Sequence, residues 1–106
     1  DRETAPREFS SMVMLVRDAL LEMKKVLDYT GDVAANYMKM EARCRKIYVF
    51  EERGDEFYRE EIRRLFTEKQ SAAYMIYWKD ILVDVERMLD AAAGAATLLQ
   101  KLFVRV

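Results

Sequence analysis

The chain has 106 residues, which is enough for one domain around a single core. It carries 18 Lys and Arg against 19 Asp and Glu, so its formal net charge of −1 gives no reason to expect nucleic acid as a partner. It contains no histidine, which excludes Ser-His and Cys-His nucleophiles, the usual zinc sites and the Glu-x-x-His iron sites of ferritin-like bundles. A sequence that is 52% hydrophobic, with only 3 Gly and 1 Pro, is typical of an all-α protein.

The first predicted helix covers residues 7–29. Pro6 suits a helix start, because proline lacks the N–H that a first turn leaves unpaired. Gly31 is expected to end the helix in a left-handed conformation, and Asp32 is a candidate N-cap for the next helix. The apolar residues that recur every three or four positions are Phe9, Met12, Val13, Val16, Leu20, Met23 and Leu27.

The second predicted helix covers residues 32–66, a length of about 50 Å at 1.5 Å per residue. Gly54 is unusual in a helix interior, where glycine costs about 1 kcal/mol relative to alanine. It indicates either a close backbone approach or a local site that excludes a side chain. The seam of this helix consists of Tyr37, Met40, Cys44, Ile47, Phe50, Gly54, Phe57 and Leu65.

The third predicted helix covers residues 72–106, after a turn at residues 67–71. Thr67 with Gln70 is a candidate capping box, and Ser71 is a second candidate cap. Two series of apolar or small residues recur every seven positions, and a third widens the stripe. The first is Trp78, Val85, Ala92, Leu99 and Val106, the second is Ile81, Met88, Ala95 and Leu102, and the third is Leu82, Leu89, Ala96 and Phe103.

These elements predict a single domain over residues 1–106, folded as a spectrin-like antiparallel bundle of three helices with two long arms. The first helix is too short to cover the far ends of the other two, whose apolar stripes continue beyond it. Exposed apolar surface of this kind favours self-association. The expected state is therefore a homodimer or a higher oligomer.

Two pairs of carboxylates are the candidate site. Glu51 and Asp55 are four residues apart on the second predicted helix, and Glu86 and Asp90 have the same spacing on the third. Antiparallel packing would bring the pairs side by side, and four carboxylates suit a hard cation such as iron(III), manganese, magnesium or calcium. The alternative is a solvated acidic surface, in which Arg59 is an ordinary ion-pair partner of Asp55.

The lone Cys44 cannot form an internal disulfide, and residues 1–10 contain no apolar run of a signal peptide, so we expect a cytoplasmic protein. Cys44 is either a small core residue or a thiol activated by its basic neighbours. A basic patch on the second predicted helix is either a solvated face or a surface that meets anionic lipid or a partner protein. The patch contains Lys39, Arg43, Arg45 and Lys46.

Two segments resemble known helices. Phe50–Phe66 resembles the middle helix of PhoU-like proteins, in particular the branch of phosphate-transport regulators or Pit accessory proteins. Tyr77–Leu82, followed by the Glu86-x-x-x-Asp90 motif and an alanine-rich tail, is similar to the following helix of that branch. The resemblance covers about residues 45–103 and corresponds to one three-helix repeat, whereas PhoU-like chains usually contain two.

The resemblance implies a non-enzymatic regulator of phosphate transport or signalling that docks on membrane transport machinery. Its partners would be a phosphate transporter or an associated regulatory protein, with peripheral membrane association at most. It also implies that Glu51, Asp55, Glu86 and Asp90 bind metal, notably iron. The alternative function is a helical interaction or oligomerisation module that binds no metal.

Overall fold

The computed structural model describes residues 4–104, in which there are three α-helices: α1 (Phe9–Asp28), α2 (Val33–Thr67) and α3 (Ala72–Val104). A short 3₁₀ helix, η1 (Tyr29–Asp32), joins α1 to α2. No β-strand occurs in these residues, so the prediction of an all-α chain is confirmed for them. Residues 105 and 106, which the third predicted helix included, lie outside the described part.

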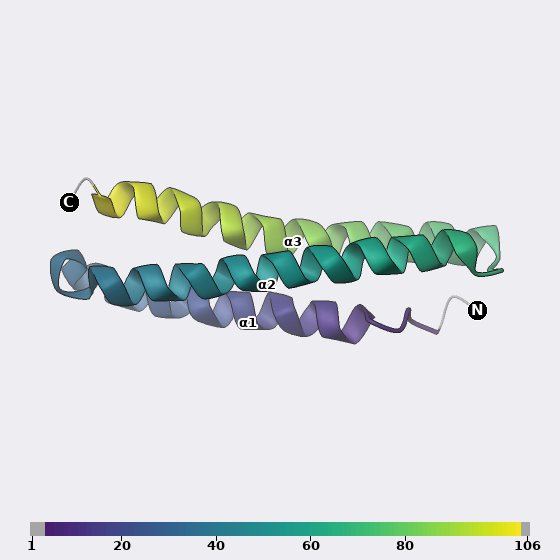
Figure 1. Cartoon of the computed structure of the whole chain (residues 1–106), viewed down its shortest axis with the longest axis horizontal. Coiled ribbons are helices and arrows are strands. Elements are labelled where there is room, and N and C mark those ends of the chain that lie inside the picture. Colours follow the sequence, from purple (N-terminus) through teal and green to yellow (C-terminus); the bar gives the residue numbers. More distant parts are fainter. Residues whose placement is uncertain (1–3, 105–106) are drawn as a thin grey trace.

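The three helices lie side by side in an elongated molecule of 55 × 18 × 16 Å (Figure 1). The chain reverses direction at η1 and again between α2 and α3, so α2 runs opposite to its two neighbours. The end where α2 passes into α3 extends beyond the start of α1. Residues 4–8 continue along this end: Pro6 is buried, and the Glu8 N–H donates to Oε1 of Glu61 over 3.0 Å.

The two reversals are built differently. At the first, Asp32 caps α2 as predicted, because its Oδ1 accepts a hydrogen bond of 3.1 Å from Ala35 N–H. The predicted left-handed Gly31 is wrong: no described residue has a positive φ, and Gly31 lies within η1. The 3₁₀ turn carries the chain to Asp32, whose φ of −146° and ψ of 84° redirect it.

At the second reversal Ser71 is the cap, since its Oγ accepts from Tyr74 N–H over 3.1 Å. Thr67 is the last residue of α2, and its hydroxyl donates a hydrogen bond of 3.0 Å to the carbonyl oxygen of Arg63. The candidate capping box of Thr67 with Gln70 is therefore not the device that starts α3.

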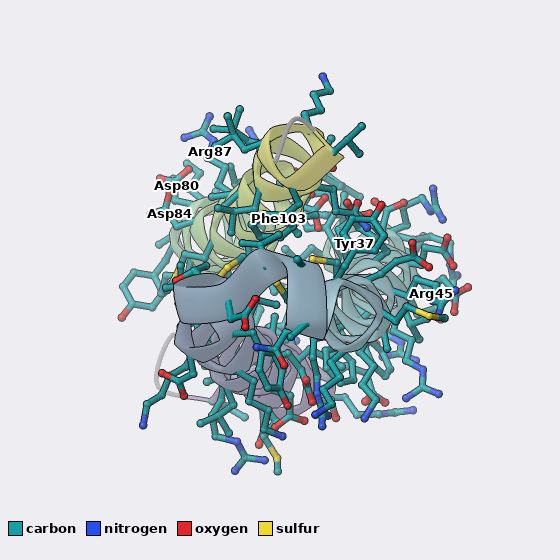
Figure 2. The ribbon with its side chains drawn as sticks, turned by 90° about the vertical axis from the view of Figure 1, so that its left-hand side faces the viewer. Tyr37, Arg45, Asp80, Asp84, Arg87 and Phe103 are labelled. Carbon is teal, nitrogen blue, oxygen red and sulfur yellow. The ribbon has the colours of Figure 1, made fainter. Side chains whose placement is uncertain are left out.

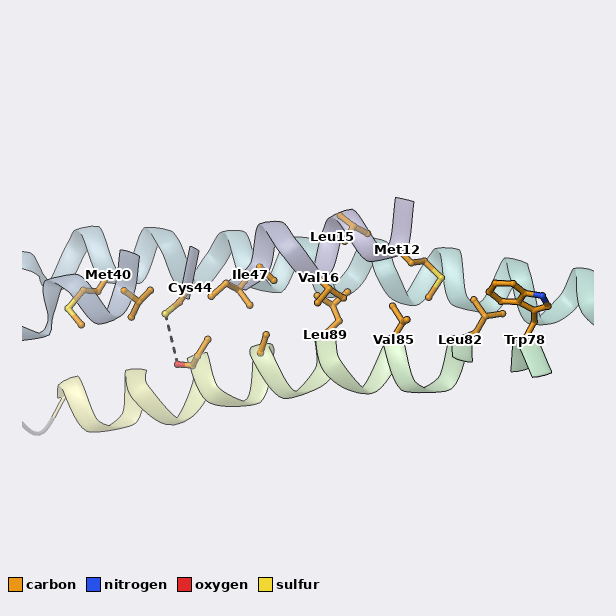
Figure 3. Packing of buried hydrophobic residues seen from close by; sticks show 14 of the residues in the cluster. Met12, Leu15, Val16, Met40, Cys44, Ile47, Trp78, Leu82, Val85 and Leu89 are labelled. Carbon is orange, nitrogen blue, oxygen red and sulfur yellow. Dashed lines mark hydrogen bonds between the residues drawn. The ribbon is translucent and has the colours of Figure 1, made fainter. Parts of the chain in front are cut away.

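The core is a continuous strip of apolar side chains from all three helices, part of which is drawn in Figure 3. At the α2–α3 turn, Trp78 packs edge-on against Phe9 with ring centroids 5.1 Å apart. Buried apolar side chains on α2 are Met40, Cys44, Ile47 and Leu65, all of which were predicted. On α3 they include Trp78, Leu82, Val85, Leu89, Ala92, Ala96 and Phe103.

Two parts of the predicted core are wrong. On α1 the buried strip runs through Leu15, Ala19 and Val26, whereas the predicted Val13, Leu20 and Leu27 are 43–53% exposed. On α3, Met88, Ala95 and Leu102 of the second predicted series are exposed as well, whereas Ile81 of that series is half-buried against the core. The apolar surface of these two helices is wider than the sector that their neighbours cover, so periodicity alone did not locate its centre.

Candidate metal centre

The predicted carboxylates lie on either side of a close contact between α2 and α3. Gly54 is buried between Glu51 and Asp55 on α2, and Leu89 lies between Glu86 and Asp90 on α3. A Cβ atom at position 54 would overlap Cδ2 of Leu89. The missing side chain leaves room for Leu89 of α3 at the level of the carboxylates. Of the two alternatives for Gly54, the structure favours a close approach, made here by a leucine side chain to the backbone of α2.

The structure brings the four carboxylates together as two couples across the α2–α3 groove. Glu51 is within hydrogen-bonding reach of Asp90, and Glu86 is within hydrogen-bonding reach of Asp55. This crossed pairing follows from antiparallel packing, in which the earlier acid of one helix meets the later acid of the other. Asp90 is exposed, and the other three residues are partly buried.

Burial and mutual repulsion shift the proton affinity of both glutamates. The pKa of Glu86 rises to about 7, first because burial penalises its charge and then because Asp90, Asp55 and Glu51 are negative. The pKa of Glu51 is also raised, by burial first and then by the charge and the hydrogen bond of Asp90. Near neutral pH, Glu86 is therefore divided between its protonated and its ionised form.

The couples do not form a closed ligand shell. Among residues 4–104, no three Cys, Asp or Glu side chains converge in a geometry that would hold a metal ion. Asp55 is also engaged by Arg59, whose Nη1 lies 2.9 Å from its Oδ2, as the solvated-surface alternative predicted. The groove thus contains four carboxylates and, beside Asp55, the positively charged side chain of Arg59.

Two other carboxylates are more deeply buried, and neither was predicted as a site residue. Glu61 is 2% exposed and accepts hydrogen bonds from Arg64 over 2.6 Å and from the Glu8 N–H. Glu22 is 7% exposed and lies between α1 and α2, beside cations of both helices. A signal was available, because both residues occupy core positions in the three- and four-residue spacing of their helices.

Cys44 is a core residue. It is fully buried, and its Sγ lies 4.0 Å from the carbonyl oxygen of Ala96, drawn as a dashed line in Figure 3. The pKa of its thiol is raised, mainly by burial and then by the charge of Glu41. The alternative of an activated thiol is therefore wrong, because the thiolate is disfavoured and reagents have no access.

Within the described range, none of the helices is both long enough and apolar enough to cross a membrane. Comparisons of the chain with protein-family models, with curated proteins and with solved structures gave no match.

Proposed function

We propose that the chain is a non-enzymatic helical protein that binds a hard cation in the α2–α3 groove through Glu51, Asp55, Glu86 and Asp90. The observation that carries this proposal is the crossed pairing of the four carboxylates beside Gly54. Oxygen-only ligands suit iron(III), manganese, magnesium or calcium. Fully ionised, the group would carry four negative charges, and a bound cation would replace their repulsion with attraction.

The biological role that we propose with this site is regulation of phosphate transport or signalling in the cytoplasm. It rests on the resemblance of residues 45–103 to PhoU-like helices, including both Glu-x-x-x-Asp motifs. The proposed fold is accordingly one PhoU-like repeat, an antiparallel three-helix bundle. A metal held at the surface would couple ion availability to docking on a transporter or its regulatory partner.

The test of the metal site is the stability of the protein with and without manganese or iron(II). Bound only by the folded state, the metal should raise the melting temperature. Asp55→Asn with Asp90→Asn should abolish that rise, since it removes one ligand from each couple. Asp80→Asn with Asp84→Asn is the matched control, because it removes the same two charges from outside the groove. These two exposed acids are four residues apart, as Glu86 and Asp90 are, but they lie on the outer side of α3, where Figure 2 labels them. Equal shifts in all three proteins would rule out the site.

Arg59 supplies a second arm of the same test. Its ion pair with Asp55 competes with a metal for one carboxylate. Arg59→Gln should therefore strengthen manganese binding, measured from the signal of free manganese in electron paramagnetic resonance. Metal binding that is unchanged or weaker in Arg59→Gln would contradict a role for Asp55 as a ligand.

A helical oligomerisation module is the second candidate, and it is favoured by an uncovered apolar face between α1 and α3. Val13, Leu20 and Leu27 recur every seven residues on the flank of α1 that lies away from the α2-facing Glu22. Met88 and Leu102 occupy the corresponding flank of α3, opposite Glu86. Such a face is typical of an interface between copies of a helical protein.

A further inference from the structure

A basic cavity lies between η1 and the first half of α2. Its volume is about 340 Å³. Three of its five lining residues are cationic and none is acidic. The lining residues are Tyr29, Lys39, Ala42, Arg43 and Lys46.

Two of these cations, Arg43 and Lys46, form ion pairs with the buried carboxylate of Glu22. Glu22 has a side chain that is 10% exposed, and its oxygens lie 3.4 Å from Nη1 of Arg43 and 3.9 Å from Nζ of Lys46. A third cation, Lys25, reaches the same carboxylate over 3.5 Å. The three cations carry three positive charges and Glu22 carries one negative charge, so a net charge of +2 remains. The contacts with Glu22 restrict the positions of these three cationic side chains.

The third lining cation is oriented by an aromatic ring. Nζ of Lys39 lies 5.8 Å from the ring centroid of Tyr29, within the range of a cation–π contact. Lys39 makes no ion pair with any residue in the range 4–104, so its charge is available to a ligand. Tyr29 itself also lines the same cavity.

The positive surface continues along α2 beyond this cavity. A second hollow of about 450 Å³ shares Lys46 and Ala42 with the first and adds Arg45 and Arg53. The carboxylate of Glu22 also lines this second hollow, so the excess of positive charge there is smaller. Arg45, on the outer side of α2 in Figure 2, is paired with Glu41 over 3.2 Å. The apolar side chains of Val49 and Phe50 form part of the wall of this second hollow.

We propose that the cavity of Tyr29, Lys39, Arg43 and Lys46 binds the phosphate group of a phosphate monoester. Guanidinium and ammonium groups are the side chains that bind phosphate oxygens through charge-assisted hydrogen bonds. The cavity exceeds the size of a phosphate ion, and the adjoining hollow with Val49 and Phe50 accommodates an attached organic group. A free metabolite and a phospholipid headgroup both present this chemistry.

The experiment is a titration of the whole chain, followed through backbone amide signals in nuclear magnetic resonance. The probes are inorganic phosphate and glycerol phosphate, with chloride at matched ionic strength as the reference for simple screening. Sedimentation with phosphatidylcholine vesicles, with or without phosphatidic acid, tests the headgroup as the source. We expect phosphate-dependent shifts confined to residues 29–50, or vesicle binding that requires phosphatidic acid.

Lys39→Gln with Lys46→Gln should reduce the affinity at least roughly tenfold, because two charge-assisted contacts are lost. Lys79→Gln with Lys101→Gln, on α3, removes the same net charge and should retain binding. The single variant Lys46→Arg keeps the charge and should retain most of the wild-type affinity. The proposal is overturned if chloride and phosphate give the same shifts and vesicles do not bind, or if both double variants bind as wild type does.

Discussion

The side chain of Leu89 occupies the space that a Cβ atom on Gly54 would fill. We therefore expect Gly54→Ala to destabilise the fold by about 1–3 kcal/mol, because a buried leucine and its helix must move to admit one methyl group. Urea unfolding measures the change. Gly94→Ala is the control: that glycine is also in a helix but has no atom within 4 Å of its missing Cβ, so alanine should stabilise by about 1 kcal/mol. Equal effects at the two positions would contradict the close approach.

The raised pKa of Glu86 makes stability depend on pH. The folded-state pKa of about 7 lies above the ordinary glutamate pKa of 4.5, so the folded protein binds the proton more tightly. This contribution is complete below pH 4.5 and is lost as the pH rises through 7. Urea unfolding between pH 5 and pH 8 should show a loss of about 1–2 kcal/mol after allowance for solvent screening.

Glu86→Gln should flatten that dependence, since the amide cannot ionise, and should exceed wild type in stability at pH 8. Glu56→Gln, at an exposed position of α2, should leave the slope of wild type intact. A slope that survives in Glu86→Gln would mean that other groups produce it. The same proton competes with metal, so manganese binding should strengthen between pH 6 and pH 8.

The buried Glu61 ties the segment before α1 to the far end of α2 through the N–H of Glu8. Glu61→Ala should cost about 2–4 kcal/mol, because Arg64 and that N–H both lose an acceptor in a largely buried place. Hydrogen exchange should accelerate first in residues 8–12. Glu60→Ala is the control, because Glu60 forms ion pairs with Arg63 and Arg64 on the exposed side of the same turn, and it should change stability little.

Self-association through the α1–α3 face is tested by placing charge on it. Leu20→Glu with Met88→Glu should weaken a dimer by roughly 100-fold, because a carboxylate buried in an apolar interface costs several kcal/mol. Light scattering over a micromolar concentration series measures the mass. Met38→Glu, at a position on α2 that is 79% exposed, should leave association as it is. A wild-type protein that stays monomeric throughout would remove the oligomer from consideration.

The helices were predictable because their signals are local. Pro6, Asp32 and Ser71 locate the starts of α1, α2 and α3 to within two residues, and each acts through its own backbone or side chain. Gly31 was misjudged for a complementary reason. Its conformation depends on whether the chain turns by a 3₁₀ helix or by a left-handed residue, and both solutions tolerate glycine.

The pairing of the carboxylates was predictable only as far as the antiparallel packing of α2 and α3. The spacing placed each pair on one helical face, but the crossed partnership of Glu51 with Asp90 depends on the register that Gly54 and Leu89 set. The helical spacing placed Glu22 and Glu61 at core positions, but it did not show which groups would satisfy their buried charges. Each has one local partner, Lys25 or Arg64, and a second that only the folded chain supplies from 21 or more residues away, Arg43 or the Glu8 N–H.

Because Cys44 is buried, the reaction of its thiol with a reagent measures local opening of the protein. The thiol is the chain's single cysteine and is sealed between α2 and α3, so a thiol-specific reagent labels the protein only when those helices separate there. The labelling rate, compared with that of the unfolded chain, gives the free energy of this opening. Metal bound in the α2–α3 groove should slow the labelling, whereas phosphate bound beside η1 should slow it only if the two ends of α2 open together.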